Sequence, residues 1–280
     1  MLKNTFRQVP GIGFKTEQRI WNSGIMEWDG FKAPYPRGFS RRQLDDLESF
    51  LEESKKQLEN RNPGFFTRRL PPKLHWRLLP EFRDSIAYLD IETTGTAAGY
   101  DRITTIVLYD GKTVYWYVSG QNLENFKTDV QKYDVIVSYN GKCFDIPFVE
   151  SDLGLRLDQA HIDLRYILAS LGYKGGLKRC ETLLGLDRGE LKGVDGFFAV
   201  RLWHDYQRNN NIKALDTLLA YNIQDAVSLE TLMVTAYNLK IKATPFADSH
   251  RLPSPPEPLV LFRPDRETIE RLKRETYYTY

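Results

Sequence analysis

Two acidic residues spaced two apart, Asp90 and Glu92, end an apolar run that begins at residue 85. Such a run is typical of a buried strand, and the two-residue period of a strand sends both carboxylates to one face and Ile91 to the other. Adjacent carboxylates repel each other unless a cation lies between them. Mg²⁺ and Mn²⁺ prefer oxygen ligands. The pair therefore predicts a divalent metal site at the end of a strand, which Thr93-Thr94-Gly95 terminates.

A third acidic candidate, Asp145, follows an apolar strand expected at residues 134–139 through the polar loop 140–144. A polar loop leaving the end of a buried strand is a usual place for a functional site. A second interpretation is that Asp145 caps a helix starting near Ile146, which Pro147 in the first turn supports. The two roles are compatible.

A fourth carboxylate lies on a long helix expected from about Lys213 to Tyr237. Tyr221 and Asp225 are four residues apart and share one face of that helix. Leucines flank them on nearly the same stripe, which points this face inward. A buried carboxylate is costly unless it is paired or bound to a metal, so Asp225 is predicted to meet the other acidic residues.

These three segments together resemble the exonuclease motifs of the DnaQ-like DEDD superfamily, in its tyrosine-bearing branch (DEDDy). The motifs are Asp90-Ile-Glu92-Thr-Thr-Gly, Asn140-Gly-Lys-Cys-Phe144-Asp145 and Tyr221-Asn-Ile-Gln-Asp225. The chain is especially similar to the YprB-like predicted exonucleases, ribonuclease-H-like proteins related to the proofreading domains of family B polymerases. The resemblance covers about residues 85–238.

The resemblance implies two divalent cations, Mg²⁺ or Mn²⁺, held by four carboxylates. Asp90 would bridge both ions, and Glu92 and Asp225 would complete the site that activates the attacking water. Asp145 would hold the second ion near the leaving 3′ oxygen. Tyr221 would orient the water through its hydroxyl group.

The implied function is a metal-dependent 3′–5′ exonuclease that prefers single-stranded DNA, with a role in DNA repair. Four residues fall where relatives bind the terminal nucleotide: Thr93, Thr94, Asn140 and Phe144. Two alternatives remain open: an RNA 3′–5′ exonuclease with the same site, and a non-catalytic nucleic-acid-binding scaffold. Single-stranded DNA is the favoured partner, and the sequence does not predict an oligomeric state.

Three further residues near these motifs are interpreted as structural. Another branch of the superfamily uses a histidine base four or five residues before the last aspartate, and neither His161 nor His204 has that spacing. Asp163 is a candidate extra ligand, but a strand-end aspartate that caps the following helix is the favoured interpretation.

The elements that must position these side chains follow an α/β pattern. Strands are expected at 85–91, 103–109 and 113–118, the last two joined by Asp110-Gly111, a strong hairpin signal. A helix near 123–132, the strand at 134–139 and a mostly helical remainder follow. The predicted fold is a ribonuclease-H-like mixed sheet flanked by helices, with an N-terminal helical arm.

Three regions are predicted: an N-terminal arm at 1–80, the exonuclease domain at 81–240, and a Pro-rich tail with a short helix at 241–280. The arm begins with a turn like half of a helix-hairpin-helix motif at 9–21, either a phosphate-binding site or a structural turn. A helix follows, with a capping box at Ser40 and Gln43. Residues 62–80, rich in Pro and Arg, are expected to be an extended linker.

The composition indicates a protein of the reducing cytoplasm that does not bind membranes, since its two cysteines form no paired motif and no apolar run could span a membrane. Residues 1–80 contain 15 Lys/Arg and 9 Asp/Glu, against 24 and 28 in the remainder. A basic N-terminal region could attract phosphates that an acidic, metal-binding site would repel. Ordinary surface variation is an equally good interpretation.

Overall fold

A five-stranded mixed sheet forms the centre of the protein. The computed structural model describes the backbone of residues 1–277 and the side chains of residues 1–275. The strand order is β3-β2-β1-β4-β5, with β1 and β2 antiparallel, β2 and β3 antiparallel, and β4 and β5 parallel to β1. The strands are β1 Ile86–Thr93, β2 Ile103–Tyr109, β3 Val114–Val118, β4 Val135–Ser138 and β5 Ala160–Asp163. The predicted α/β class with a ribonuclease-H-like mixed sheet is confirmed.

The turn between β2 and β3 is the predicted Asp110-Gly111 hairpin. One carboxylate oxygen of Asp110 accepts hydrogen bonds from the backbone N–H groups of Lys112, at 2.9 Å, and Thr113, at 2.8 Å. Gly111 has a φ of 86°, which glycine adopts without the steric cost of a side chain. The turn thereby fixes the register in which Tyr109 pairs with Val114.

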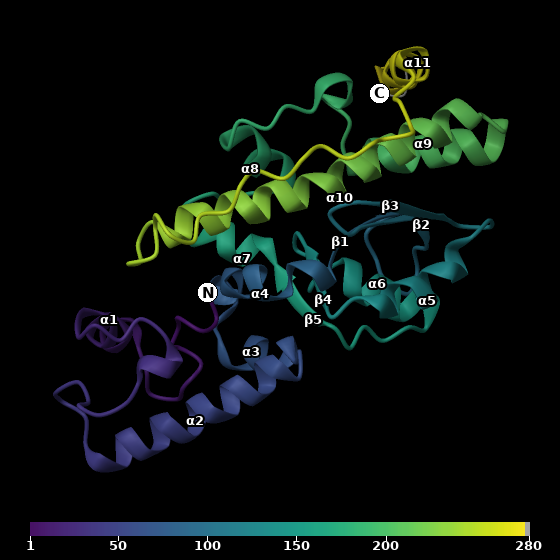
Figure 1. Cartoon of the computed structure of the whole chain (residues 1–280). Coiled ribbons are helices and arrows are strands. Elements are labelled where there is room, and N and C mark those ends of the chain that lie inside the picture. The colour runs from purple at the N-terminus through teal and green to yellow at the C-terminus, as the bar shows by residue number, and fades with distance from the viewer. Residues whose placement is uncertain (278–280) are drawn as a thin grey trace.

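Helices cover both faces of the sheet, and alternate residues of β1 point to opposite faces. Leu89 and Ile91 pack with Phe148 of helix α6 (Asp145–Leu153) in one apolar cluster. Tyr88 packs with Leu229 of helix α10 (Ile212–Ile241) in another. Figure 1 shows α10 and α9 (Gly196–Asn209) on one side of the sheet and α5 (Phe126–Asp129) and α6 on the other. Asp90 and Glu92, in phase with Tyr88, therefore face α10.

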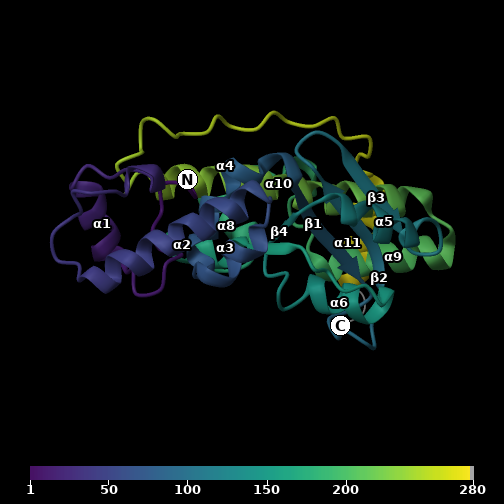
Figure 2. The same cartoon turned by 60° about the horizontal axis from the view of Figure 1, so that its bottom comes forward.

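The thirty-residue helix α10 is the longest element. It was predicted at about 213–237, and Asn211 caps its start by accepting a hydrogen bond from the Lys213 N–H. The C-terminal segment returns along its length, as the yellow-green trace in Figure 2 shows. Leu252 and Asn238 exchange two hydrogen bonds at one end of this run, and Asp265 bonds to Thr217 at the other. The predicted C-terminal helix follows as α11 (Arg266–Tyr277).

The N-terminal region packs against the sheet domain through a continuous apolar core. Helices α1 (Phe14–Asn22) and α2 (Arg41–Glu59) supply Trp21 and Leu47 to the same cluster as Met233 of α10. The capping box predicted for α2 is present, with the Ser40 hydroxyl and the Gln43 side chain each bonding to the other's backbone N–H. The division of the chain at residue 80 and at residue 240 stays a prediction.

Residues 62–80 are helical, so the expectation of an extended linker is wrong. Helix α3 (Pro63–Arg69), a 3₁₀ segment at Pro72–Leu78 and helix α4 (Leu79–Phe82) occupy this stretch. Asn62 caps α3 by accepting from the Phe65 N–H, and Pro63 occupies the first turn. Proline suits that position because N–H groups in the first turn have no acceptor within the helix, so the N–H that proline lacks is not needed there. The prolines here begin helices instead of preventing them.

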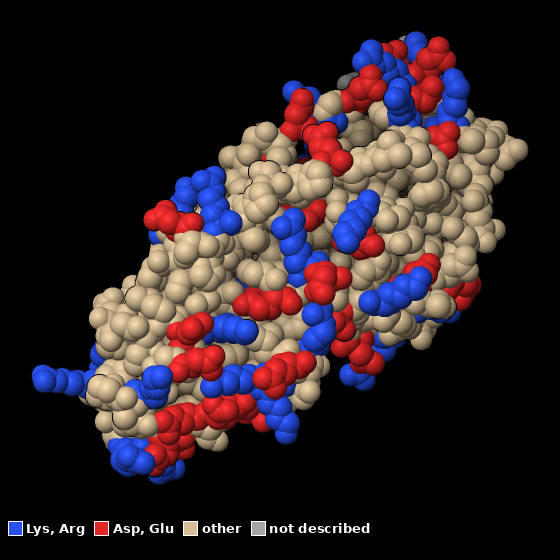
Figure 3. All heavy atoms as spheres, in the orientation of Figure 1, with Lys and Arg blue, Asp and Glu red and all other residues tan. Residues whose placement is uncertain are grey.

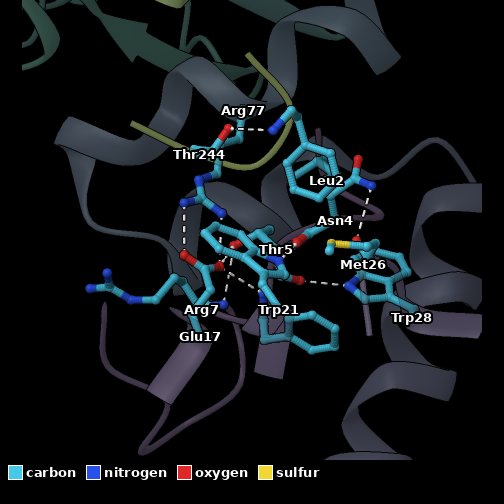
Figure 4. A network of polar contacts seen from close by, with 12 residues as sticks. Leu2, Asn4, Thr5, Arg7, Glu17, Trp21, Met26, Trp28, Arg77 and Thr244 are labelled. Carbon is cyan, nitrogen blue, oxygen red and sulfur yellow. Dashed lines mark hydrogen bonds and ion pairs between the residues drawn. The ribbon is translucent and has the colours of Figure 1, made fainter. Parts of the chain in front are cut away.

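A buried polar network fixes the N-terminal region, as Figure 4 shows. The guanidinium of Arg77 donates two hydrogen bonds to the carboxylate of Glu17, at 2.8 and 2.9 Å. The Thr5 hydroxyl donates a third at 2.6 Å. The indole N–H of Trp21 bonds to the Asn4 carbonyl at 2.9 Å. Since Glu17 is fully buried, these bonds replace the water that its carboxylate loses on folding.

Surface charges of both signs alternate over the N-terminal region. Figure 3 shows red and blue side chains intermingled over α2, at the lower left. Basic residues here pair with acidic ones, as in Arg41–Asp45 at 3.1 Å and Lys55–Glu52 at 2.7 Å. The surplus of basic residues in 1–80 thus produces no uniformly basic surface on this face. In residues 1–277, none of the helices combines the length and apolar character needed to cross a lipid bilayer.

Candidate active site

Three of the four predicted carboxylates meet between the sheet and α10. Asp90 and Glu92 come from the end of β1, and Asp225 comes from the middle of α10. One carboxylate oxygen from each lies within 4.8 Å of the other two. The strand period aims the first two at α10, and the apolar residues around Asp225 pack that face of the helix inward. Asp90 and Glu92 thus share one face of β1, as the two-residue period predicts, and Asp225 meets them there; their roles as catalytic and metal-binding residues stay predictions.

Asn222 orients Asp90. Its side-chain amide donates to Asp90 Oδ2 at 2.6 Å, and its carbonyl oxygen accepts from the Thr105 hydroxyl of β2 at 2.9 Å. Asn222 is fully buried and lies three residues before Asp225, on the same face of α10. The sequence analysis gave this asparagine no role, although a polar residue on an inward face was a usable signal.

Asp145 lies outside this group of three, but it lines one cavity together with Asp90 and Glu92. It is the first residue of α6, and the N-cap position belongs to Phe144, so the interpretation that Asp145 caps the helix is wrong. Its carboxyl group is almost fully buried, and burial raises its pKa to about 7. The charge of Asp145 in turn contributes to raising the pKa values of Asp90 and Glu92.

The carboxylates destabilise one another's charged forms. Burial is the main cause that raises the pKa of Asp90 far above its usual value, and the charges of Asp225 and Glu92 raise it further. Burial likewise raises the pKa of Glu92, and the charge of Asp225 adds to this rise. Like charges in a poorly solvated space favour a proton or a cation between them. This arrangement is the electrostatic signature of a cation site.

Two basic side chains border the acidic group, and the sequence analysis missed both. Arg188 forms an ion pair with Asp225 and another with Glu181, the latter at 2.5 Å. Lys178, at the start of helix α8 (Leu177–Leu183), donates to the Tyr221 hydroxyl at 2.6 Å and to the Val194 carbonyl at 2.7 Å. Both residues lie between β5 and α9, Lys178 on the short helix α8 and Arg188 in the loop after it, where no periodic pattern links them to the acidic motifs.

Tyr221 lies beside the acidic group with its side chain almost fully buried. Burial raises the pKa of its hydroxyl well above the usual value, and the charges of Asp225 and Glu92 add to the rise. The phenol therefore keeps its proton at any physiological pH. Since Lys178 donates to the hydroxyl oxygen, the hydroxyl hydrogen remains available for another acceptor.

The cavity over the site has a volume of about 440 Å³. Its walls include all four residues predicted to bind the terminal nucleotide: Thr93, Thr94, Asn140 and Phe144. The first turn of α9 contributes Phe197, whose side chain is 71% exposed. This exposed ring in the cavity wall was not among the residues predicted from the sequence.

The loop after β4 depends on two residues with special backbone needs. Asn140 has a φ of 65°, in the left-handed region that asparagine tolerates. Its N–H donates to the Asp163 carboxylate at 2.8 Å. A side chain at Gly141 would overlap the Ser138 hydroxyl. Asp163 also caps helix α7 (Leu164–Ala169) through the Arg165 N–H, which confirms its interpretation as a capping residue.

The two histidines are placed as structural residues. His161 bonds to the Ser138 hydroxyl at 2.7 Å from β5, and burial lowers its pKa to about 3. His204 is exposed on α9. Neither belongs to the acidic group identified among the described residues.

The residues present fit a divalent cation. Carboxylate oxygens are the ligands that Mg²⁺ and Mn²⁺ prefer, and three of them converge here with Asp145 in the adjoining wall. Arg188 occupies a single oxygen of Asp225. Oxygen atoms that could bind a cation therefore remain on all three residues. A cation bound to these oxygens would balance the buried negative charges. The neighbouring basic residues balance those charges only in part.

Comparisons with known proteins identify one family by its sequence model. A sequence model of the RNase_H superfamily matches residues 87–237. No curated protein is similar in sequence. Among solved structures, the family B DNA polymerase from the hyperthermophilic archaeon Pyrobaculum calidifontis is similar, with 18% identity and a TM-score of 0.40. The similarity covers 56% of this chain and 24% of that polymerase, so the chain spans about a quarter of the polymerase's length.

Proposed function

Because the chain belongs to the RNase_H superfamily, whose members are generally hydrolytic nucleases that use divalent metals, we propose that it is a metal-dependent 3′–5′ exonuclease acting on single-stranded DNA. The observation that carries the proposal is the convergence of Asp90, Glu92 and Asp225, with oxygens within 4.8 Å of one another. The order and spacing of their motifs resemble those of tyrosine-bearing DEDD exonucleases of the YprB-like kind.

The carboxylates would hold two divalent cations, which when bound activate water and neutralise the charge of the transition state. Asp90, Glu92 and Asp225 would supply one set of ligands, and Asp145, which lines the same cavity as Asp90 and Glu92, would supply a further one. Asn222 keeps the Asp90 carboxylate in one orientation. Such fixed ligands lower the reorganisation needed during the reaction.

Tyr221 would orient the attacking water. Its hydroxyl group retains its proton because burial and the nearby carboxylates raise its pKa. Lys178 fixes the hydroxyl oxygen by donating a 2.6 Å hydrogen bond, so the phenolic hydrogen would be free to bond to the water. A water held in this way meets the phosphorus atom in a reproducible direction.

The terminal nucleotide would bind in the 440 Å³ cavity. Thr93, Thr94 and Asn140 offer polar groups, and the rings of Phe144 and Phe197 offer apolar faces to a base. Aromatic side chains bind unpaired bases by stacking, which a base inside a duplex does not permit. This supports a single-stranded substrate, and the motif resemblance to proofreading domains favours DNA over RNA.

The decisive experiment is a time course on a 5′-labelled DNA oligonucleotide with Mn²⁺, comparing wild type with Asp90→Ala. Wild type should give a ladder that shortens from the 3′ end, and Asp90→Ala should lose activity by on the order of 10³-fold or more. Asp158→Ala is the matched control, because Asp158 is 80% exposed and its ion pair within the described side chains is with the exposed Arg156. Undiminished activity in pure Asp90→Ala protein would refute the proposal.

Two companion substrates define the reaction further. A 3′-phosphate should block digestion, whereas continued cleavage would indicate an endonuclease. A matched RNA oligomer, digested in parallel, distinguishes the RNA exonuclease alternative. Tight binding with no metal-dependent turnover on either polymer would indicate the scaffold alternative.

Tyr221→Phe tests the role of the phenol apart from metal binding. The variant keeps the ring and removes only the hydroxyl group, so turnover should fall by about 10²-fold while Mn²⁺ affinity is unchanged. Steady-state kinetics and Mn²⁺ titration monitored by electron paramagnetic resonance measure the two effects. Equal losses in both would mean that Tyr221 shapes the metal site instead.

A further inference from the structure

A second cavity adjoins the candidate active site, and apart from Asn140 its wall residues lie outside the predicted motifs. This α7–α8 groove, of about 620 Å³, lies between the end of β4, helix α7 and the start of α8. Its walls are formed by Tyr139, Asn140, Arg165, Ala169, Tyr173, Lys174, Gly175, Gly176 and Leu177. Tyr139 and Asn140 also line the active-site cavity, so the two spaces meet at these residues.

The groove differs in charge from the other prominent cavities. The described walls of the other four each include at least one Asp or Glu. The α7–α8 groove instead contains Arg165 and Lys174, both exposed. Among the side chains of residues 1–275, neither forms an ion pair with a carboxylate within 4.0 Å. Their charges therefore remain available to an anionic ligand.

The groove also offers aromatic surface and a fixed connection to the active site. Tyr173 is half-buried in the wall. The guanidinium of Arg165 bonds to the side-chain oxygen of Asn140, the residue shared by both cavities. The Tyr139 hydroxyl bonds to the Gly175 carbonyl and so ties the end of β4 to the loop before α8. Unpaired cations beside an aromatic ring are the usual elements of a site for single-stranded nucleic acid.

We propose that the α7–α8 groove binds the nucleotides immediately 5′ of the terminal one, with Arg165 and Lys174 contacting phosphates and Tyr173 stacking on a base. The proposal rests on the proposed function. If the 3′-terminal nucleotide occupies the active-site cavity, the strand can leave only in the 5′ direction. The groove that shares two wall residues with the cavity, and has the opposite charge, is the path that such a polyanion would take.

The test compares two double variants that remove the same number of charges. Arg165→Gln/Lys174→Gln alters the groove, and Lys112→Gln/Arg156→Gln alters exposed basic residues outside both cavities. Binding of 5′-fluorescein oligothymidylates of one to eight nucleotides is measured by fluorescence anisotropy with Ca²⁺ in place of Mn²⁺. Each affinity is measured over a range of salt concentrations.

The groove variant should bind the longer oligomers about 10-fold more weakly and dTMP unchanged, because only the longer ligands reach the groove. Two lost phosphate contacts should lower the slope of log Kd against log salt by about 1.4, at about 0.7 per contact for single strands. The control variant should match wild type. An unchanged slope, an equal loss for dTMP or an equal loss in the control would overturn the proposal.

Two single variants keep the proposal testable if the double variant folds poorly. Lys174→Gln alone should lower the slope by about 0.7. Tyr173→Leu should abolish the quenching of a 2-aminopurine placed at the penultimate position, which stacking on the tyrosine would cause. Quenching that survives in Tyr173→Leu would contradict the assigned stacking role.

The binding assay separates this proposal from the proposed function. Normal digestion of DNA with an unaffected groove variant would reject the groove and keep the exonuclease. Length-dependent binding that requires Arg165 and Lys174, with no metal-dependent turnover, would reject the exonuclease and keep the groove.

Discussion

Among the regions of the molecule that bury carboxylates, two stabilise or oppose the buried charge in contrasting ways. In the N-terminal region, the Glu17 carboxylate is fully buried and accepts four hydrogen bonds, from both terminal nitrogens of Arg77, the Thr5 hydroxyl and the Phe6 N–H. At the end of β1, three carboxylates crowd together with oxygens within 4.8 Å. Two basic residues border that group, and the pKa values of the carboxylates are still raised.

The difference separates structural charge from charge that awaits a ligand. A buried ion pair with all its hydrogen bonds made is a completed structure, and removing either partner is costly. A cluster of like charges costs stability in the absence of a cation, so its persistence points to a function. Burial alone does not make this distinction, since Glu17 and Asp225 are both almost fully buried.

The largest expected effect comes from unpairing the structural charge. Arg77→Met leaves the buried Glu17 carboxylate without its cation and should lower the free energy of unfolding by about 3–5 kcal/mol. Asp90→Asn, which removes a repelling charge from the metal-free site, should leave the stability unchanged or raise it. Urea denaturation in EDTA at pH 8 measures both. If the two substitutions destabilise the protein equally, the contrast between the paired Glu17 and the acidic group at the candidate site is refuted.

A smaller effect depends on pH. The Asp145 carboxyl has a pKa of about 7 in the folded protein against a usual 3.8, so the folded state holds a proton that the unfolded chain has released. The free energy of unfolding of the metal-free protein therefore falls as the pH rises from about 4 to about 7. Asp145→Asn lacks this pH-dependent loss. At pH 8 its free energy of unfolding should therefore exceed that of wild type by at most about 4 kcal/mol, at 1.36 kcal/mol per pKa unit.

The measurement for Asp145→Asn is urea denaturation in EDTA at pH 5 and at pH 8. The advantage of the variant over wild type should be larger at pH 8. A difference that is the same at both pH values would show that the carboxyl does not titrate in this window.

The smallest effect is the stabilisation by metal. Mn²⁺ at 100 times its Kd should stabilise wild type by about 2.7 kcal/mol, because only the folded state presents the ligands. Asp225→Asn should lose most of this gain, and Arg77→Met should keep it despite its lower Tm. Thermal unfolding with and without Mn²⁺ measures the gain. If Asp225→Asn gains as much as wild type, the cation binds elsewhere.

The features predictable from the sequence were those with local periodicity. The alternation along β1 placed Asp90 and Glu92 on one face, and the four-residue spacing on α10 placed Tyr221 beside Asp225. The Asp110-Gly111 turn and the Ser40 capping box were likewise readable from neighbouring residues. Each of these depends on a few adjacent positions, where backbone geometry limits the outcome.

The features that were missed depend on contacts between distant residues. Lys178 meets Tyr221 across 43 positions and Arg188 meets Asp225 across 37, and neither lies in a regular pattern. The expectation for residues 62–80 was wrong for a different reason. Proline and arginine suggested an extended chain, but Pro63 at the first turn of α3 and the buried Arg77 fit a helical segment packed in the core.

Helix α10 has a mechanical consequence. It is thirty residues long, about 45 Å at 1.5 Å per residue. Tyr221 and Asp225 lie near its middle, and Met233 and Tyr237 farther along pack in the same core as Trp21 and Leu47 of the N-terminal region. One stiff rod therefore belongs to both halves, and they cannot hinge about a flexible joint. We therefore expect the candidate site to bind its ligand without a closing motion between the two halves.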